Sequence, residues 1–475
     1  MGAKISNGSG VSFEKKDIIS FLGAFVVFGI VVTFVPAAWD IKAAFGIIGL
    51  GTVLWVTKPL PLSMTAILVV LLLVGSNAVP LNVTLSGFST GSLFLVLAGL
   101  MMAQGVNATN LGKRMALTIL VRFGKSPASA LWGLFLALEI LAFAVPATAV
   151  RTLLLLPTVI AIIDSVDSEE GPSNVKKLFL FGLCFGVNIT GAGILPGALA
   201  NVMTAEMVSN LTGVSFGYYK WLLYAFPISI LLIPLTIMIL LWVFPTDIKK
   251  FNPQIFKDKL DELGAVDWKE KRCGLVLIIT ILLWLSEPLH GWHPAVPAIV
   301  ATLLMSFPGI GFIQWEELLC INWGTVLLLG TALSLGTVLN ETGGAEYIAS
   351  IFLRIDGLSG IFAVPVLGAA AVALLTIIYH LGVGHVTTVV ATLIPVVVEI
   401  CTNIGVNPVL YGFVVGISSL FGFILVIETL PNIIVYNSGY LHPLDWIKPG
   451  FWISLAALFV ISIVAWLWWP LVGLV

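Results

Sequence analysis

The sequence predicts an all-α polytopic membrane protein with eleven transmembrane spans, two re-entrant hairpins and two inverted-topology repeats. Of its 475 residues, 59% are hydrophobic and only 10% are charged. The mean hydropathy of +1.10 is far above that of a soluble globular domain. The net charge of −2 and the lack of a basic stripe give no sign of a nucleic-acid partner. We therefore expect a lipid bilayer to surround most of the chain.

Eleven apolar segments reach the length of about 20 residues that is needed to cross about 30 Å of hydrocarbon. Two further apolar regions, 128–163 and 358–400, are each broken at the middle into halves that are marginal for a full crossing. We interpret both as re-entrant hairpins. The eleven spans begin at Ile18, Ala43, Pro61, Gly87, Lys177, Trp221, Gly274, Pro294, Gly324, Pro408 and Phe451.

The distribution of Lys and Arg predicts a cytoplasmic N-terminus. A polar stretch precedes the first apolar run, and it lacks the cleavage pattern of a signal peptide, so we expect this run to stay as a helix. With the N-terminus inside, all but four of the 22 Lys and Arg residues fall on the inner side, as the positive-inside rule requires. The exceptions are Lys42, Lys220 and Arg354 outside, and Arg151 in the membrane. The absence of a transit peptide favours a bacterial cytoplasmic membrane.

An internal repeat flanks the main cytoplasmic connection. Pro61 matches Pro294 at an offset of 233, and Asn201 matches Asn432 at an offset of 231, with the order of the matches preserved. Because each unit contains an odd number of crossings, the second copy must be inverted relative to the first. The predicted parts are an N-terminus with the first span (1–42), repeat one (43–247), the cytoplasmic connection (248–272) and repeat two (273–475).

Each hairpin is predicted to reverse at a break, within 144–149 in the first and 381–385 in the second. Two further breaks, at 194–201 and 428–432, interrupt the fifth and tenth spans. A helix that starts at a break presents free N–H groups and about half a positive charge. Inverted symmetry brings the tips together at the midplane, where broken helices form anion sites. The alternative is that the breaks are kinks that adjust packing.

Two ionisable residues lie at the predicted tips, Arg151 and His385. Burying a guanidinium at the bilayer centre costs about 2.5–3.5 kcal/mol on insertion scales, so Arg151 needs an anionic partner or water. A carboxylate substrate would serve, and an internal pair with Glu139 or Glu428 is the alternative. We include His385 in the predicted site because it lies in the matched tip. His380, one turn back, is interpreted as a packing residue.

Amides and hydroxyls complete the predicted substrate site. Asn201 and Asn432 can donate and accept hydrogen bonds at once, which suits a carboxylate or carbonyl ligand. Helix capping at a break is a compatible alternative role. The neighbouring hydroxyls are those of Thr148, Thr387, Thr388 and Thr429. No H-E-x-x-H motif occurs and the G-x-S-x-G match at 87–91 follows no strand, so we expect neither an enzyme nor a metal or cofactor.

From about Ala43 onward the chain resembles the divalent anion/sodium symporter family. The clearest similarity is P-N-I-I-V-Y-N-S-G at 431–439, which is similar to the family's P-N-A-I-V-F-G-S-G. The resemblance implies eleven spans, an elevator motion of a transport domain against a dimerising scaffold, and Ser-Asn-Thr motifs at the hairpin tips. Those motifs are mostly erased here, because they fall on Ala147, Thr148 and Ala149 in the first tip and on His385, Val386 and Thr387 in the second.

The segment P-A-T-A-V-R at 146–151 is similar to the P-S-N-T-A-R tip of the family's dicarboxylate exchangers. That branch trades one dicarboxylate for another without sodium, which implies substrates such as succinate, malate or 2-oxoglutarate. Our hypothesis is that Arg151 and His385 are the built-in counterions of a sodium-independent antiporter.

Two other functions remain open at this point. One is a sodium-coupled symporter of dicarboxylate, citrate or sulfate, with ion sites formed by backbone carbonyls near Asn188, Thr190, Ser418 and Ser419. The other is an anion channel, which would also need positive charge at the midplane but would conduct without saturable exchange. An intramembrane hydrolase lacks support, because no nucleophile–base or metal constellation is present.

Overall fold

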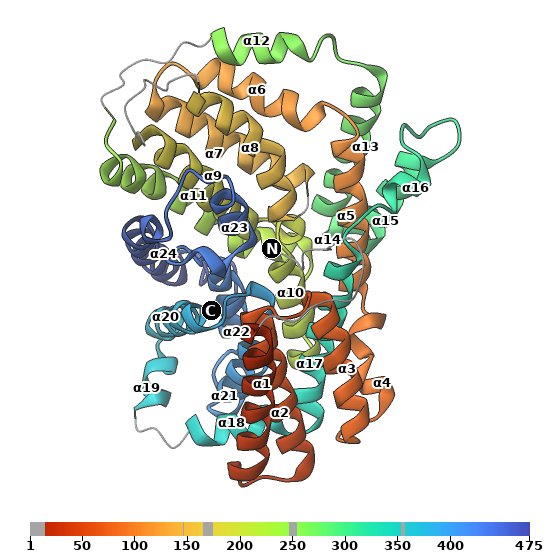
Figure 1. The fold of residues 1–475 in the computed structure, drawn as a ribbon, viewed down its shortest axis with the longest axis vertical. Helices are drawn as coiled ribbons and strands as arrows, with labels where there is room; N and C mark the ends of the chain where they lie inside the picture. The colour runs from red at the N-terminus through yellow and green to blue at the C-terminus, as the bar shows by residue number, and fades with distance from the viewer. Residues whose placement is uncertain (1–14, 146, 165–173, 247–253, 353–356) are drawn as a thin grey trace.

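A computed structural model describes residues 15–145, 147–164, 174–246, 254–352 and 357–475, and in these ranges every regular element is a helix (Figure 1). The predicted all-α class is therefore confirmed. Pro146 of the first tip, part of the cytoplasmic connection (247–253) and Arg354 lie outside the described residues.

The first half of the chain contains α1 to α11 with two short 3-10 helices. They are α1 (Lys15–Phe34), α2 (Trp39–Thr57), α3 (Leu62–Ser76), α4 (Leu81–Thr84), η1 (Ser86–Ser89), α5 (Gly91–Asn107), α6 (Leu111–Phe123), α7 (Pro127–Ala144), α8 (Thr148–Asp164), α9 (Asn174–Gly193), η2 (Leu195–Gly197), α10 (Leu199–Thr212) and α11 (Tyr218–Val243).

The second half follows α12 (Gln254–Glu262), which belongs to the predicted connection. It comprises α13 (Trp268–Leu285), α14 (Glu287–His290), α15 (Ala295–Ser306), α16 (Trp315–Leu318), α17 (Trp323–Glu341), α18 (Gly344–Phe352), α19 (Leu358–Ala363), α20 (Pro365–Gly382), α21 (Val386–Asn403), α22 (Pro408–Ser419), η3 (Val426–Glu428), α23 (Leu430–Tyr436), η4 (Pro443–Trp446) and α24 (Ile447–Leu467).

Each predicted span coincides with a helix of this list. Among the described residues, eight helices are long and apolar enough to cross a membrane, or nine if α5 and α6, bent by 67°, form one broken span. Two of the eight are α20 and α21, so the prediction that the halves of the second hairpin are marginal for a full crossing is wrong by length and composition. Helices α3, α7, α15 and α22 are apolar but shorter. The count of eleven spans therefore stays a prediction.

The chain leaves helical geometry at all four predicted breaks. The first hairpin turns between α7 and α8, and the second turns between α20 and α21, preceded by the separate short helix α19. The fifth span is split into α9, η2 and α10, and the tenth into α22, η3 and α23. Side-chain caps begin only some of these helices: Thr429 caps α23, whereas Ala198 before α10 makes no side-chain cap.

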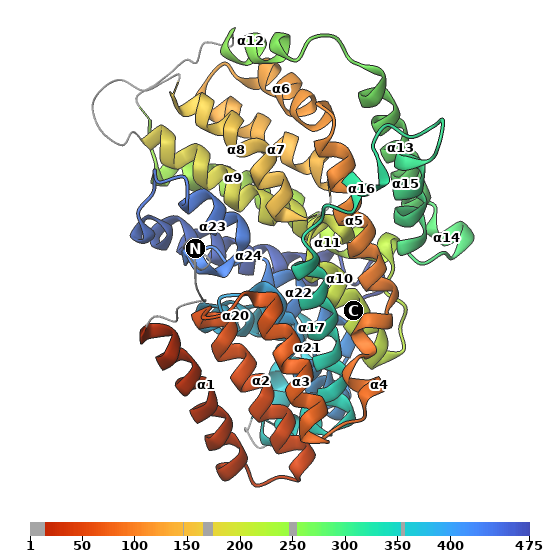
Figure 2. The same cartoon turned by 45° about the vertical axis from the view of Figure 1, so that its right-hand side comes forward.

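Helices of the first half pack on helices of the second half. Helix α5 of the first half packs on α15 of the second half, and α17 of the second half packs on α3 of the first half. In both Figure 1 and Figure 2, α6, α7, α8 and α12 lie at one end of the molecule, and Figure 1 shows α18 near the other end. This reciprocal arrangement is what two related repeats would give, although the repeat boundaries remain predictions.

Glycines allow the broken spans to be held tightly at the centre. A Cβ on Gly182 of α9 would lie 2.5 Å from Leu131 of α7, and one on Gly186 would lie 2.7 Å from Leu138. In the second half, Gly412 and Gly416 of α22 make the same kind of close approach to Val208 and Thr204 of α10. Small residues let helix backbones approach closely in membranes, where lipid supplies no hydrophobic driving force.

An ion pair anchors the connection between the halves. Arg114 of α6 donates from Nε to one oxygen of Glu270 at 2.6 Å and from Nη2 to the other at 3.0 Å. The same guanidinium donates to the carbonyls of Leu263 and Gly264, which lie between α12 and α13. Glu270 is only 2% exposed. Such a bidentate pair fixes geometry as well as energy.

We expect Glu270→Ala to destabilise the protein by about 3 kcal/mol, because it leaves the Arg114 charge without its carboxylate. Thermal unfolding of the purified protein in detergent measures this. The control is Glu262→Ala, at an exposed position of α12, with an expected change below about 0.5 kcal/mol. Equal loss in both variants would show that the ion pair contributes nothing specific.

Candidate functional site

A cavity lies where the two hairpin tips meet the two broken spans. It comprises about 490 Å³ of space that protein atoms do not fill, part of which is open to solvent. Five of the predicted site residues line it: Thr148, His385, Val386, Thr387 and Thr429. The other lining residues are Asn188, Ala198, Leu199, Ala200, Gly384, Leu420, Ile427, Glu428, Leu430, Pro431 and Ile433.

Four helices begin at this cavity. The first residues of α8, α10, α21 and α23, which are Thr148, Leu199, Val386 and Leu430, all line it. The first turn of a helix leaves N–H groups without intrahelical partners and carries a partial positive charge. None of the lining residues is Lys or Arg. The arrangement therefore favours an anion held by backbone N–H groups.

Polar side chains hold the helix starts in place. Thr429 Oγ1 accepts the Asn432 N–H at 3.3 Å and the Asn188 amide at 3.0 Å. His385 is the N-cap of α21, and its Nδ1 lies 2.7 Å from Thr387 Oγ1. Capping, which the sequence left as an alternative role for these hydroxyls, is thus observed at Thr429. Predicted residues Thr388, 2% exposed, and Ala149 do not line the cavity.

Arg151 lies behind the first tip rather than on the cavity wall. It is 0% exposed, and it donates to Gly197 O at 2.8 Å and Thr190 Oγ1 at 3.1 Å. Two longer bonds, of 3.4 Å, reach Leu138 O and Val187 O. A Cβ on Gly191 would lie 2.6 Å from Nη2, so the guanidinium needs a glycine there. These bonds tie both helices of the first hairpin to α9 and its break.

Neither of the internal partners foreseen for Arg151 pairs with it. Within the described part of the chain, Arg151 forms no ion pair with Glu139 or Glu428. Glu139, from α7, is 7% exposed and neither of its carboxylate oxygens has a hydrogen-bond partner among the described residues. Only neutral oxygens bond to the guanidinium, so its charge is not cancelled by direct contact. Its action on a bound anion stays a prediction.

Asn201 and Asn432 perform the same task at the two breaks. The Asn201 amide donates to Gly191 O and Ile194 O, both at 2.8 Å. The Asn432 amide donates to Gly422 O at 2.9 Å and Leu425 O at 3.1 Å. In each case one acceptor lies 10 residues and the other 7 residues before the asparagine. Each acceptor at the first break lies 231 positions before its counterpart at the second break. Both asparagines are 0% exposed and neither lines the cavity.

Three buried amide oxygens near the breaks are also unsatisfied. In the described residues, Oδ1 of Asn188, Asn201 and Asn432 has no hydrogen-bond partner. Such oxygens accept water or coordinate a cation such as Na⁺. Groups of three or more His, Cys, Asp or Glu side chains suited to a metal ion do not occur among the described residues.

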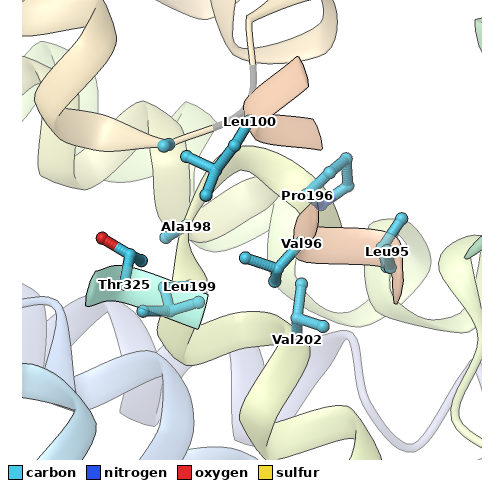
Figure 3. Close-up of a pocket in the computed structure, with 9 residues that line it drawn as sticks. Leu95, Val96, Leu100, Pro196, Ala198, Leu199, Val202 and Thr325 are labelled. Atoms are coloured by element: carbon cyan, nitrogen blue, oxygen red, sulfur yellow. The ribbon is translucent and has the colours of Figure 1, made fainter. Parts of the chain in front are cut away.

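A second, apolar pocket adjoins the cavity (Figure 3). It is lined by Leu95, Val96 and Leu100 of α5, by Pro196 of the first break and by Val202 of α10. Ala198 and Leu199 line both spaces, so they form the wall between them. The predicted site residue Ala147 lines this apolar pocket, whereas its neighbour Thr148 lines the cavity.

The turn at the first tip is strained. Ala147 has a φ of 74°, in the left-handed region. That conformation costs an alanine about 1–2 kcal/mol. The hydrogen bond of 3.4 Å from Ala147 N–H to Pro196 O joins the tip to the first break. Strain of this kind persists only where the surrounding structure holds it, and it is common at ligand sites.

Sequence reasoning did not assign a site role to Glu428 or His380. Glu428 lines the cavity, and its Oε2 accepts the N–H groups of Ile424 and Leu425, both at 2.8 Å. His380 of α20 is 1% exposed and lies against Gly422 of the same break. The available signal was the position of Glu428 directly before Thr429, inside a predicted break.

A family model described as "Sodium:sulfate symporter transmembrane region" matches residues 15–475. The chain belongs to this family, the divalent anion/sodium symporters. An uncharacterized transporter of Haemophilus influenzae is 27% identical over 469 residues, covering 96% of this chain and 98% of that one. The sodium-dependent dicarboxylate transporter SdcS of Staphylococcus aureus (strain USA300) is 26% identical over 447 residues, covering 88% and 84%.

The fold is also similar to that of a solved transporter. The YdaH transporter of Alcanivorax borkumensis gives a TM-score of 0.52 at 13% identity, covering 82% of this chain and 87% of that one. At this identity the likeness concerns the fold alone. This member of the divalent anion/sodium symporters is thus a multi-pass membrane protein of a transporter family.

The asparagine pair generates a prediction for this symporter-family site. Asn201→Ala leaves the buried carbonyls of Gly191 and Ile194 without a donor, at a cost of about 1–3 kcal/mol for each unsatisfied group. We expect lower thermal stability and weaker substrate binding than in Asn210→Ala, at an exposed position of the same helix. Thermal unfolding and equilibrium binding of succinate measure both effects. Unchanged behaviour of Asn201→Ala would mean that water replaces the amide at no cost.

Proposed function

We propose that this protein is a secondary active transporter that exchanges dicarboxylates, such as succinate, malate and 2-oxoglutarate, without sodium. The observation that supports it is the start of four helices at one cavity whose lining contains no Lys or Arg. Two of these helices, α8 and α10, come from the first half and two, α21 and α23, from the second. A ligand with two separated carboxylates suits two opposed sets of helix starts.

Independence from sodium is supported by the way the breaks are satisfied. Backbone carbonyls at a broken helix are the natural ligands of a dissolved cation in transporters. Here the Gly197 carbonyl accepts from Arg151, those of Gly191 and Ile194 accept from Asn201, and Trp221 Nε1 donates to Ala192 O at 3.0 Å. Hydrogen-bond donors of the protein thus occupy carbonyl oxygens that could otherwise coordinate a cation.

Fixed charges also favour exchange over net transport. Arg151 is permanently charged and cannot leave with the substrate. An empty carrier would keep that charge in the low-dielectric barrier without its anion, which is costly. Return with a second dicarboxylate avoids this cost, so exchange is the faster cycle. His385, on the cavity wall, is the second built-in counterion in this proposal.

The wider architecture of the proposal follows from the same features. We infer a transport domain formed by the hairpins and broken spans, which moves as an elevator against a scaffold that dimerises. The inverted repeats at 43–247 and 273–475, the connection at 248–272 and a cytoplasmic N-terminus in a bacterial cytoplasmic membrane belong to this proposal. No cofactor is required, and the partners are the dicarboxylates, the bilayer and a second copy.

A sodium-coupled symporter is the second candidate. Two observations favour it: the relative SdcS is a sodium-dependent dicarboxylate transporter by name, and three buried asparagine oxygens lack partners in the described residues. Sulfate, the ion in the family's description, is a possible substrate in this case.

The test is uptake of labelled succinate into proteoliposomes that are empty or loaded with succinate, with and without sodium. We expect sodium-free uptake into loaded vesicles and little into empty ones. Strict sodium dependence from empty vesicles would reject sodium-free exchange in favour of symport. Currents in planar bilayers that do not saturate with succinate would instead indicate an anion channel.

Arg151→Ala is expected to reduce sodium-free exchange to the level of protein-free liposomes, because the charge behind the first tip and its bond to Gly197 O are both lost. Arg151→Lys keeps the charge but not the fork of donors, and should retain part of the activity. The control is Lys220→Ala, which removes an exposed cation. Size-exclusion profiles verify that the variants fold. Unchanged exchange by Arg151→Ala would contradict the role given to this residue.

A further inference from the structure

The exchange proposed above assigns no role to two buried ionisable residues at the second break. Glu428 lines the cavity and is 1% exposed. His380 is also 1% exposed. Both residues flank Gly422, where a Cβ would lie 2.7 Å from Glu428 Cβ and 2.7 Å from His380 Cε1. His385 lines the same cavity as Glu428.

The local backbone stabilises a negative charge on Glu428. Its Oε2 accepts two N–H groups, from Ile424 and Leu425, each at 2.8 Å. Hydrogen bonds of this kind, from backbone N–H to an ionised carboxylate, are stronger than neutral ones. The empty cavity can therefore hold Glu428 as a carboxylate.

A bound dicarboxylate makes that charge unfavourable. The substrate would bring two negative charges into the cavity that Glu428 already lines. Like charges about 4 Å apart repel by about 4 kcal/mol at an effective dielectric constant of about 20. One proton on Glu428 removes this repulsion, and a neutral carboxyl group can then donate a hydrogen bond to the substrate.

The counterions of the proposed function balance the substrate and not Glu428, which forms no ion pair among the described residues. Arg151 of α8 donates to neutral acceptors, and the other charges near these counterions are Glu139 of α7, near Arg151, and Lys58 after α2, near His385. Helices α9, α22 and α23 contain no Asp, Glu or His. The two lysines of α9 are engaged elsewhere, Lys176 over the ring of Tyr440 and Lys177 with Asp445.

We propose that each dicarboxylate enters the cavity together with one proton, which Glu428 takes up. On loading, a proton from water in the cavity joins the Glu428 carboxylate to give a carboxylic acid. On release, the acid O–H returns its proton to water and the carboxylate regains its two backbone hydrogen bonds. His380, which lies against the same glycine as Glu428, is positioned to pass this proton through its ring nitrogens.

This inference rests on the proposed function, and it adds the co-transported ion. In exchange, both directions carry the same proton, so trading one dicarboxylate for another moves no net proton. The proton therefore does not alter the exchange stoichiometry, but it makes substrate affinity depend on pH. Protons and dicarboxylate bind together, so each raises the affinity for the other.

The first test uses purified wild-type protein and succinate in weakly buffered, sodium-free solution, at a pH where succinate itself is fully ionised. We expect the solution to become alkaline on succinate binding, by about one proton per bound succinate, as linkage requires. The dissociation constant should rise by up to about tenfold per pH unit once Glu428 is ionised in the empty site. No proton uptake and a pH-independent affinity would overturn the inference.

The variant test compares two buried carboxylates. Glu428→Gln should abolish the proton uptake and flatten the pH dependence, because the amide cannot ionise. Glu139→Gln, outside the cavity lining, should keep both. Loss in Glu139→Gln but not in Glu428→Gln would overturn the assignment. If Glu428→Gln fails to fold, the wild-type measurement decides alone.

A repeat of the wild-type measurement in sodium buffer separates the two proposals. Proton uptake that occurs only with sodium would reject sodium-free exchange and keep the role of Glu428. Sodium-free exchange without proton uptake in either buffer would keep the proposed function and reject the role of Glu428.

Discussion

The structure depends on satisfying the backbone where four helices are interrupted inside an apolar surrounding. An unpaired carbonyl or N–H group in hydrocarbon costs several kcal/mol, so a break is tolerated only where other groups replace the lost helical bonds. Arg151 and Asn201 do this at the first break, and Asn432 does it at the second. In the proposed function, N–H groups in the first turns of the helices that follow hold the ligand. In this proposal, the carbonyls before each break contribute to stability, and the N–H groups after it contribute to binding.

This constraint explains why much of the fold could be read from the sequence. Apolar segments of spanning length and Pro- or Gly-containing interruptions are local properties, and each predicted break was found within a few residues. The pairing of Asn201 with Asn432 was visible as an offset of 231, and the structure shows an equal pattern of hydrogen bonds at both positions. Exact span lengths were not predictable, because tertiary packing decides where α5 bends or α9 stops.

The direction of each side chain was the part that sequence could not supply. Arg151 and Asn201 were predicted to face the substrate, whereas their donors turn toward carbonyls of the break, and neither lines the cavity. A partial rotation about the helix axis would turn the same side chain from the break toward the cavity. Residue type alone does not distinguish these two directions. Thr148 and Ala147 illustrate the same limit, because adjacent residues line two different spaces. Glu428 was in view only as a partner for Arg151, since its own position on the cavity wall depends on the turn of η3.

The interlocking of the halves has an evolutionary consequence. Helix α10 of the first half packs on α21 and α22 of the second, and α23 of the second half packs on α8 and α9 of the first. Each half therefore completes the other's binding wall, and neither would enclose a ligand alone. An ancestral gene encoding one such unit would have needed two copies inserted in opposite orientations in the same bilayer. If the proposed repeats arose in this way, fusion of the duplicated genes would have freed each half to diverge, so that a guanidinium came to serve the first break alone.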